Sequence, residues 1–321
     1  MLKISNSRIN KFLSCPYAHY VKYYEGLVPK RSGAALQRGS AIHQAIEDYH
    51  NGKSWKKSVD KFSKEFYKNT FKEEILEFGD IPKMVYSLCD NYFHYYDEKE
   101  DNVTYVENEH HFELKLCKGV TLEGYIDSVL DVDGKIWAKE TKTYKKMPDR
   151  NFLIFNRQSA IYTWALLHEY PKVSGTIWDI ILAQQPGRPE LTQKGVLSQK
   201  RIKSTPLELE RGIKELGLDP KDYESYINSA RWEDFFVRHP IILSKNILNS
   251  VMDDTIEIAK LIRDEGHKRK EKNLGKGCSF CEYKSLCQAE LLNLDKEFII
   301  KADYKQREES DNGKKAKIKI K

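Results

Sequence analysis

The first third of the chain places its apolar residues at the spacing of a helix. From about Gly39 onward, Ile42, Ile46 and Tyr49 recur so that they would share one side of a helix. Segments rich in lysine and glutamate, with apolar residues at a similar spacing, follow. We therefore expect residues 1–100 to be mainly helical.

The pattern then changes to alternation of apolar and polar residues, beginning near residue 103. Phe112 and Leu114 alternate with polar neighbours, which is typical of a half-buried strand. Asp133-Gly134 separates two such runs, and this dipeptide is a strong indication of a two-residue hairpin turn. The centre of the chain is therefore predicted to contain an antiparallel hairpin.

The remaining pattern completes an α/β fold. We predict a helix over roughly 152–168, a strand from Gly175 to Ala183, and a long helix from about 246 to 271. One integrated domain is expected. Its successive parts are a helical region at 1–100, a core at 101–186, a polar insertion with short helices at 187–240, a helix with a cysteine cluster at 241–300, and a basic tail at 301–321.

Composition and charge exclude some classes of protein. Apolar residues make up 40% of the chain and charged residues 32%, as in folded water-soluble proteins. No apolar run approaches the roughly 18 residues that cross a bilayer, and no secretory signal is recognisable, so a cytoplasmic protein is expected. The Walker A pattern is absent, which argues against a nucleotide-driven motor. The net charge of +6 is concentrated in the tail, so charge alone does not indicate a nucleic-acid-binding protein.

The predicted hairpin brings three charged residues together. With a two-residue turn at Asp133-Gly134, paired positions have residue numbers that sum to 267, so Asp127 lies opposite Glu140. Side chains paired in this way have Cβ atoms roughly 4.5–5.5 Å apart. Lys142 is two residues beyond Glu140 and projects from the same face.

Such a pair of carboxylates needs a cation. At ~5 Å and an effective dielectric of ~20 their repulsion costs about 3 kcal/mol. A divalent metal with hard oxygen ligands would relieve it. The alternative is a solvated charged face on which Lys142 is the counterion, and the hairpin alone leaves both interpretations open.

Four motifs, taken in order, resemble those of one family. Gly39-Ser40-Ala41-Ile42-His43 precedes Gly124-Tyr125-Ile126-Asp127, which is followed by Glu140-Thr141-Lys142-Thr143 and by Gln158-Ser159-Ala160-Ile161-Tyr162. The set resembles the PD-(D/E)XK nuclease superfamily, and more closely its RecB/AddB-like iron–sulfur exonuclease branch, which is similar to RecB-like CRISPR-associated nucleases and phage exonucleases. The resemblance implies a restriction-endonuclease-like core, with a mixed central sheet flanked by helices. Ile126 replaces the proline of the superfamily name, and Glu140 replaces the commoner aspartate.

The resemblance also implies roles for individual residues. His43, Asp127, Glu140 and the backbone carbonyl of Thr141 would bind Mg²⁺ or Mn²⁺, and Lys142 would orient the attacking water or stabilise the charge that develops on the phosphate. Gln158 and Tyr162, one helical turn apart, would contact the substrate strand. Taken singly, a histidine in this setting is more often structural, and a Gln/Tyr pair more often packs or lies at the surface; the ordered set of motifs favours the functional roles.

Cysteine spacing predicts a second metal centre. Cys278, Cys281 and Cys287 form a CxxC-x5-C run, which is a strong ligand pattern that lacks a fourth donor. By the same resemblance that donor is Cys15, and the occupant is a [4Fe–4S] cluster; four thiolates could also hold zinc. Ligands so far apart in sequence would join the two ends of the chain. Cys89 and Cys117 match no motif and are expected to be free thiols.

The sequence therefore predicts a metal-dependent DNA nuclease. An exonuclease acting on single-stranded DNA or DNA ends, in recombination, repair or phage DNA metabolism, is the function that the resemblance favours. A non-catalytic DNA-binding or adaptor protein on a nuclease fold is the main alternative. An RNA-processing enzyme with a structural zinc is another.

Overall fold

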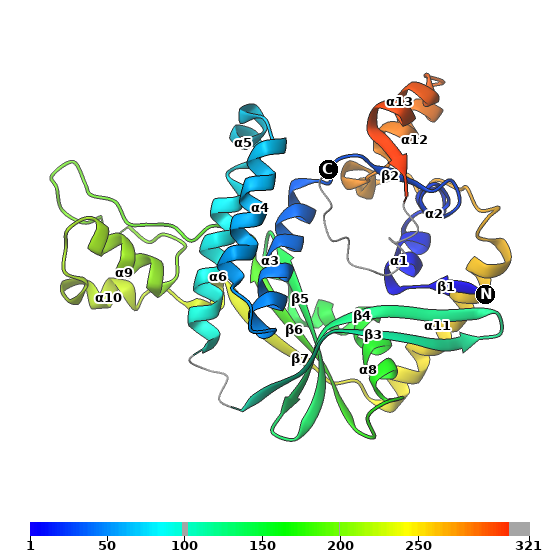
Figure 1. Ribbon diagram of the computed structural model, residues 1–321, viewed down its shortest axis with the longest axis horizontal. Helices are drawn as coiled ribbons and strands as arrows, with labels where there is room; N and C mark the ends of the chain where they lie inside the picture. Colours follow the sequence, from blue (N-terminus) through cyan, green and yellow to red (C-terminus); the bar gives the residue numbers. More distant parts are fainter. Residues whose placement is uncertain (98–101, 199, 308–321) are drawn as a thin grey trace.

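The chain folds around one mixed sheet with helices on both sides, as predicted (Figure 1). The computed structural model describes residues 1–97, 102–198 and 200–307. The sheet has the strand order β1-β4-β5-β6-β7, and β3 also pairs with β4. The strands are β1 (Leu2–Ile4), β3 (Val103–Cys117), β4 (Val120–Val132), β5 (Lys135–Tyr144), β6 (Val173–Leu182) and β7 (Phe236–Ile241).

The predicted hairpin is present between β4 and β5. Asp133 and Gly134 have φ values of 51° and 75°, the left-handed backbone that a tight hairpin turn requires. The register places Ser128 opposite Lys139, so the paired numbers sum to 267 as expected. The ladder ends at that pair, however, one position before Asp127 and Glu140 would pair.

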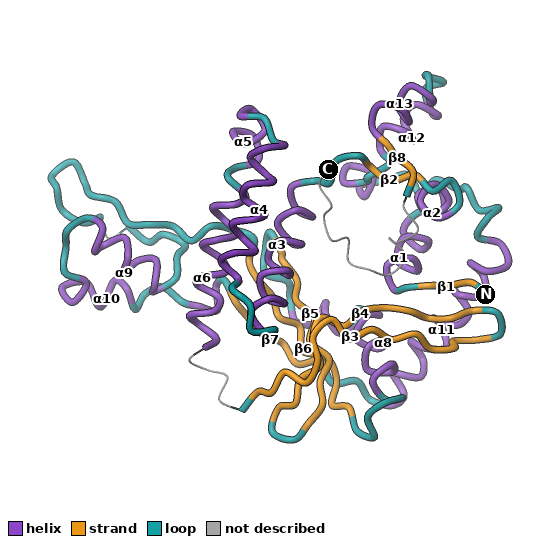
Figure 2. Tube along the Cα trace, viewed as in Figure 1, coloured by secondary structure: helices purple, strands orange, loops and turns teal. Residues whose placement is uncertain are grey.

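Strand β4 changes partner along one of its edges. Residues 120–122 pair with β1 and residues 128–132 pair with β5, while β3 runs along the opposite edge. Figure 2 shows the long β3–β4 ribbon extending beneath β1. Between the two partners, residues 123–127 have no strand on this edge. Asp127 lies at the point where β4 and β5 diverge.

Two groups of helices cover the sheet (Figure 1). The first comprises α3 (Ala34–His50), α4 (Trp55–Asn69) and α6 (Ile81–Asp97), which share a core with apolar side chains of β6 and β7. The second comprises α1 (Asn6–Ser14), α8 (Arg157–Leu166) and α11 (Lys245–Glu265), which pack on β3, β4 and β5. Helix α5 (Lys72–Phe78) follows α4 at the edge of the first group.

The two ends of the described chain meet in a small separate core. Strand β2 (Leu27–Pro29) pairs antiparallel with β8 (Tyr304–Gln306). The Tyr283 hydroxyl donates a hydrogen bond to the Leu27 carbonyl at 2.9 Å. Helices α2 (Pro16–Tyr23) and α12 (Lys284–Leu291) pack here, next to α13 (Lys296–Asp303). The N- and C-terminal parts therefore meet, as expected, and the backbone pairing of β2 with β8 joins them.

Several predicted boundaries were wrong. The region predicted as helical contains β1 and β2, three residues each, which are too short to show a period. The helix predicted over 152–168 is two helices, α7 (Arg150–Ile154) and α8, because the Asn156 side chain accepts from the Gln158 N–H and begins a new helix. The helix predicted to reach 271 ends at Glu265.

The predicted insertion is partly separate from the sheet. Helices α9 (Pro206–Glu215) and α10 (Glu224–Ile227) share a small core of their own and project from the rest of the molecule (Figure 1). The segment predicted to end at 240 nevertheless includes most of β7, which pairs with β6 in the central sheet. The sequence of this strand, Phe236-Val237-Arg238-His239-Pro240-Ile241, places two polar residues side by side and does not alternate clearly enough to predict a strand.

The predicted basic tail begins within folded chain. Residues 301–303 belong to α13 and residues 304–306 to β8, and the GKKAKIKIK segment lies outside the described residues. Within residues 1–97, 102–198 and 200–307, no helix has the length and apolar character needed to cross a membrane.

Candidate active site

The Asp127 carboxylate connects the two strands where they diverge. Its Oδ2 atom accepts a hydrogen bond from the Thr141 N–H at 2.8 Å. The same oxygen lies 3.1 Å from His43 Nδ1, supplied by α3. Asp127 is buried. A side chain of one strand therefore binds the backbone of the other at the position where the ladder stops.

The two carboxylate oxygens of Glu140 differ in their partners. Its Oε1 atom forms an ion pair with the Lys142 ammonium, as expected from their common face. Its Oε2 atom is buried and has no hydrogen-bond partner among the described residues. Leaving a buried polar atom without a partner costs about 1–3 kcal/mol, more when it is charged. Glu140 itself is only 2% exposed, so water does not readily compensate.

This donor set fits a divalent cation. Asp127 and Glu140 offer hard carboxylate oxygens, and His43 offers an imidazole nitrogen, the combination that Mn²⁺ and Mg²⁺ sites use. The buried Oε2 atom of Glu140 is the strongest sign, because a cation would satisfy it. The structure thus brings His43 of α3 against Asp127 of β4, and Glu140 against Lys142 on β5. The ligand atoms of His43, Asp127 and Glu140 do not all lie within 4.8 Å of one another, so a cation would have to draw the two pairs together.

Gln158 and Tyr162 form an internal chain of hydrogen bonds beside these carboxylates. Gln158 Nε2 donates to the Tyr162 hydroxyl at 2.6 Å, and that hydroxyl donates to the Tyr125 carbonyl at 2.7 Å. Burial, followed by the negative charges of Glu140 and Asp127, raises the pKa of Tyr162 well above its usual value. The hydroxyl is therefore neutral and ties α8 to β4 two residues before Asp127.

The four predicted cluster cysteines lie in the region where the chain ends meet. Cys15, Cys281 and Cys287 pack against the same small core. Burial raises the pKa of the Cys287 thiol, although the Lys272 ammonium opposes this, and the other three thiols add smaller contributions in the same direction as burial. Within the described chain, no three of these sulfur atoms lie within 4.8 Å of one another.

The two other cysteines lie apart from this group. Cys89 is buried on α6, and Cys117 is half-buried at the end of β3. Burial raises the pKa of the Cys89 thiol, which makes it unreactive.

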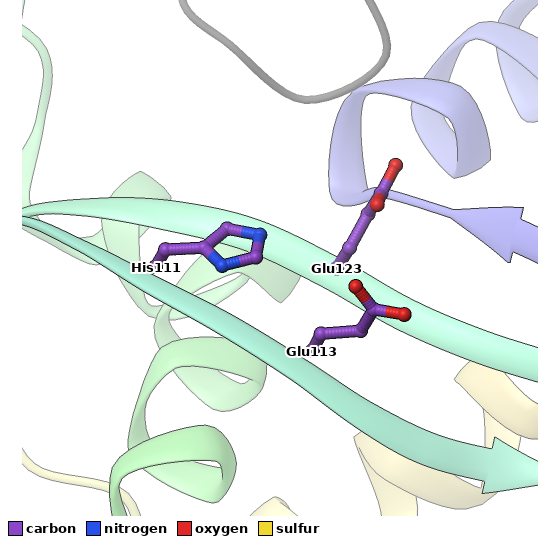
Figure 3. A group of neighbouring side chains, drawn as sticks. All are labelled: His111, Glu113 and Glu123. Atoms are coloured by element: carbon purple, nitrogen blue, oxygen red, sulfur yellow. The ribbon is translucent and has the colours of Figure 1, made fainter.

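The structure also gathers residues that sequence analysis did not single out. His111 and Glu113 of β3 and Glu123 of β4 have ligand atoms within 4.8 Å of one another (Figure 3). The ammonium of Lys3 lies 2.7 Å from Glu113 and 3.4 Å from Glu123, so a protein cation already compensates these carboxylates. Only the β3–β4 register, which pairs Glu113 with Glu123, could have revealed the group.

A second unpredicted feature is a fully buried ion pair behind the site. Lys139 Nζ lies 3.0 Å from Asp179 Oδ2, and neither side chain is exposed. Arg238 adds a second cation 3.5 Å from the same carboxylate. Although burial alone would raise the pKa of Asp179, the charges of Lys139 and Arg238 bring it below its usual value. The pair joins β5 to β6 at the residue next to Glu140.

Comparison with known proteins gives one strong match. The model of the PD-(D/E)XK nuclease superfamily matches residues 3–288. No curated protein sequence matches the chain significantly. The crystal structure of SSO0001 is similar at a TM-score of 0.33 and 11% identity, covering 89% of this chain and 86% of that chain. A candidate exonuclease from Eubacterium rectale is similar at a TM-score of 0.37 and 12% identity, covering 77% and 87%.

Proposed function

The chain belongs to the PD-(D/E)XK nuclease superfamily, and we propose that it is a metal-dependent deoxyribonuclease whose catalytic residues are Asp127, Glu140 and Lys142. One observation carries the proposal. Glu140 keeps one buried oxygen without a hydrogen-bond partner, and its other oxygen pairs with Lys142, while the neighbouring Asp127 carboxylate contacts His43. A decayed site would not be expected to keep all four groups, which argues against the alternative of a non-catalytic DNA-binding or adaptor protein.

Each side chain has a task that its position supports. His43, Asp127, Glu140 and the Thr141 carbonyl would hold Mg²⁺ or Mn²⁺, which polarises the phosphodiester and lowers the pKa of a bound water. The Thr141 N–H keeps the Asp127 carboxylate in place. Lys142 orients the attacking water or places its positive charge beside the phosphate oxygen that gains negative charge.

The preferred substrate is DNA with a free end, either single-stranded or at the end of a duplex. We include Gln158 and Tyr162 among the residues that meet the strand, since both lie beside the carboxylates. Degradation from an end suits a role in recombination, repair or phage DNA metabolism. The helical parts on both sides of the sheet are consistent with a strand that enters end first.

We further propose that Cys15, Cys278, Cys281 and Cys287 hold a [4Fe–4S] cluster. On a tetrahedral zinc with Zn–S bonds of ~2.3 Å, the sulfur atoms would lie about 3.8 Å apart. No three of the described thiols lie within even 4.8 Å of one another, so the proposal rests on the CxxC-x5-C spacing of the sequence and on the resemblance, not on a preformed cluster site. Anaerobically purified protein should be brown and contain iron at about four atoms per chain; colourless protein with one zinc would overturn this assignment and favour the structural-zinc alternative.

The activity is tested with three labelled substrates in Mn²⁺ and in EDTA. Linear single-stranded DNA labelled at its 5′ end, the same strand labelled at its 3′ end, and a circular single strand are incubated in parallel. The two linear substrates should be degraded only in Mn²⁺, and the circle should persist. Cleavage of the circle would contradict the exonuclease proposal, and an RNA strand cut faster than DNA would favour the RNA-processing alternative.

A further inference from the structure

Two aromatic side chains are exposed on the segment that joins the active strand to α8. Phe152 on α7 is 62% exposed, and Phe155, directly after α7, is 85% exposed. Burying a phenyl ring stabilises a folded protein by roughly 1.5–3 kcal/mol, so leaving two in solvent is unfavourable unless something covers them. Between them Leu153 is fully buried, so the segment has an inner and an outer side.

The inner side of this segment rests on β6, the strand that pairs with the active strand β5. Leu153 shares a core with Trp178 and Ile180 of β6. In the β5–β6 ladder these two residues pair with Glu140 and Lys142. The exposed rings are therefore carried by a helix that packs beside the catalytic residues, on the face that they share.

The backbone that carries the rings is held by hydrogen bonds. The Asp149 side chain accepts from the Asn151 N–H at 2.8 Å and begins α7. Arg150 donates to the Pro240 carbonyl of β7 at 3.3 Å. The Asn156 N–H donates to the Leu153 carbonyl at 3.1 Å, and Asn156 then caps α8. The rings thus project from ordered backbone.

The segment that carries the two rings is rich in basic residues. Between positions 142 and 158 the only acidic residue is Asp149. The cations of the same stretch are Lys142, Lys145, Lys146, Arg150 and Arg157. Lys145, Lys146 and Arg150 are exposed. Exposed aromatic rings among lysines and arginines suit a single-stranded nucleic acid, whose bases stack on the rings while its phosphates meet the cations.

We propose that Phe152 and Phe155 form a stacking platform for unpaired bases of the DNA strand that the active site cleaves. The inference rests on the proposed nuclease function and adds a preference for single-stranded over duplex DNA at this position. In a duplex the bases are already stacked on one another, so stacking on the rings would add little to the affinity for duplex DNA. The segment that carries the rings packs through Leu153 on Ile180, the ladder partner of Lys142, so a strand held by the rings would approach the active strand from this segment.

Binding is measured in EDTA, so that cleavage does not interfere, with a fluorescent single strand and a duplex of the same sequence. Phe152→Ala and Phe155→Ala should each weaken single-strand binding about tenfold, the effect of losing one stacked base, and leave duplex binding unchanged. Phe298→Ala removes a ring of similar exposure on α13 and should have no effect. Equal affinity of all variants for the single strand would overturn the platform.

A conservative variant supplies a direct readout. Phe155→Trp should keep wild-type affinity, and its indole fluorescence should be quenched by the single strand and not by the duplex. Absence of quenching, with affinity retained, would contradict stacking. If the wild-type protein self-associates and the alanine variants do not, while DNA affinity is unchanged, the rings contact a second copy and the proposal is wrong.

These outcomes remain separable from those of the nuclease proposal. Wild-type protein that binds single strands through the two rings but never cleaves DNA would overturn the enzyme and leave the platform. Wild-type protein that cleaves DNA, with single-strand affinity and KM unchanged in both alanine variants, would overturn the platform and leave the enzyme.

Discussion

Two carboxylates share the centre of the candidate site, and each is held differently. Asp127 is fixed by the Thr141 N–H, whereas Glu140 has an oxygen that no group of the described chain satisfies. The register of the hairpin as far as Ser128 and Lys139 could be predicted from residue numbers alone, because Asp133-Gly134 fixes the turn. The divergence of β4 and β5 at Asp127 could not be predicted, because it depends on the long-range pairing of β4 with β1.

Replacing Glu140 tests whether the cation binds here. In wild-type protein, Mn²⁺ at a hundred times its Kd should stabilise the fold by about 2.7 kcal/mol. Glu140→Gln should lose most of this stabilisation, without a fall of the Tm in EDTA, because the buried unpartnered charge is gone. Thermal unfolding with and without Mn²⁺ measures both. Glu113→Gln is the matched control in the other carboxylate group, and loss of the Mn²⁺ effect there would place the cation at His111, Glu113 and Glu123.

The buried pair behind the site gives a stability prediction. Asp179→Asn leaves Lys139 as a fully buried cation, and breaking such a pair from one side costs about 3–5 kcal/mol. Urea unfolding should show this loss. Asp264→Asn, which removes an exposed partner of Arg263, should leave the urea midpoint unchanged. A similar midpoint for the two variants would mean that the buried pair contributes little.

Among the helices and strands, those that could be predicted are long or end in a recognisable turn. Those that could not are short and depend on partners far away in the sequence. The long helices and the β4–β5 hairpin could be predicted because their periods extend over many residues or end in a defined turn. Strands β1 and β2 have three residues each and acquire their structure from distant partners, β4 and β8. The packing of the helical N-terminal region against the strands is likewise a tertiary property.

The α1–α2 pair carries a pH-dependent contribution to stability. His19 is fully buried and accepts a hydrogen bond from Arg8 at 3.3 Å. Burial, followed by the Arg8 charge, lowers its pKa from 6.5 to about 3. The unfolded chain therefore binds a proton before the folded one, and stability falls as the pH drops from 6.5 towards 3, by about 1.4 kcal/mol per pH unit.

The substitution His19→Gln keeps an acceptor for Arg8 and removes this titration. The decline in the free energy of unfolding between pH 6 and pH 4 should be shallower in the variant than in the wild-type protein, as measured by urea unfolding at each pH. Parallel curves would show that His19 becomes protonated without unfolding.

At the scale of the molecule, the two ends of the described chain meet, and the candidate cluster lies at that junction. Pairing of β2 with β8 joins the ends independently of the cysteines. Cys15 begins α2, and His43 follows on α3, so the N-terminal segment extends from the junction to the active site. The spacing of Cys278, Cys281 and Cys287 could be recognised in the sequence, whereas the meeting of the chain ends depends on tertiary packing.

If the proposed cluster is present, its loss should affect stability and the proposed nuclease activity together. Cys15→Ala is expected to lower the iron content, reduce the Tm and slow DNA cleavage about tenfold, the size of effect seen when support for a metal ligand is lost. Cys117→Ala, a half-buried thiol outside the group, serves as the control. Normal unfolding and full activity of Cys15→Ala would contradict the idea that the cluster joins the chain ends.

Asp127, Glu140 and Lys142 are the residues through which this fold is proposed to cleave DNA. The most direct test compares wild-type protein with Lys142→Ala on end-labelled single-stranded DNA in Mn²⁺, with EDTA as the blank. Wild-type protein should degrade the strand only in Mn²⁺, and Lys142→Ala should bind it normally but cleave it at least about a hundred times more slowly. No cleavage by the wild-type protein, or equal rates for the two proteins, would contradict the account.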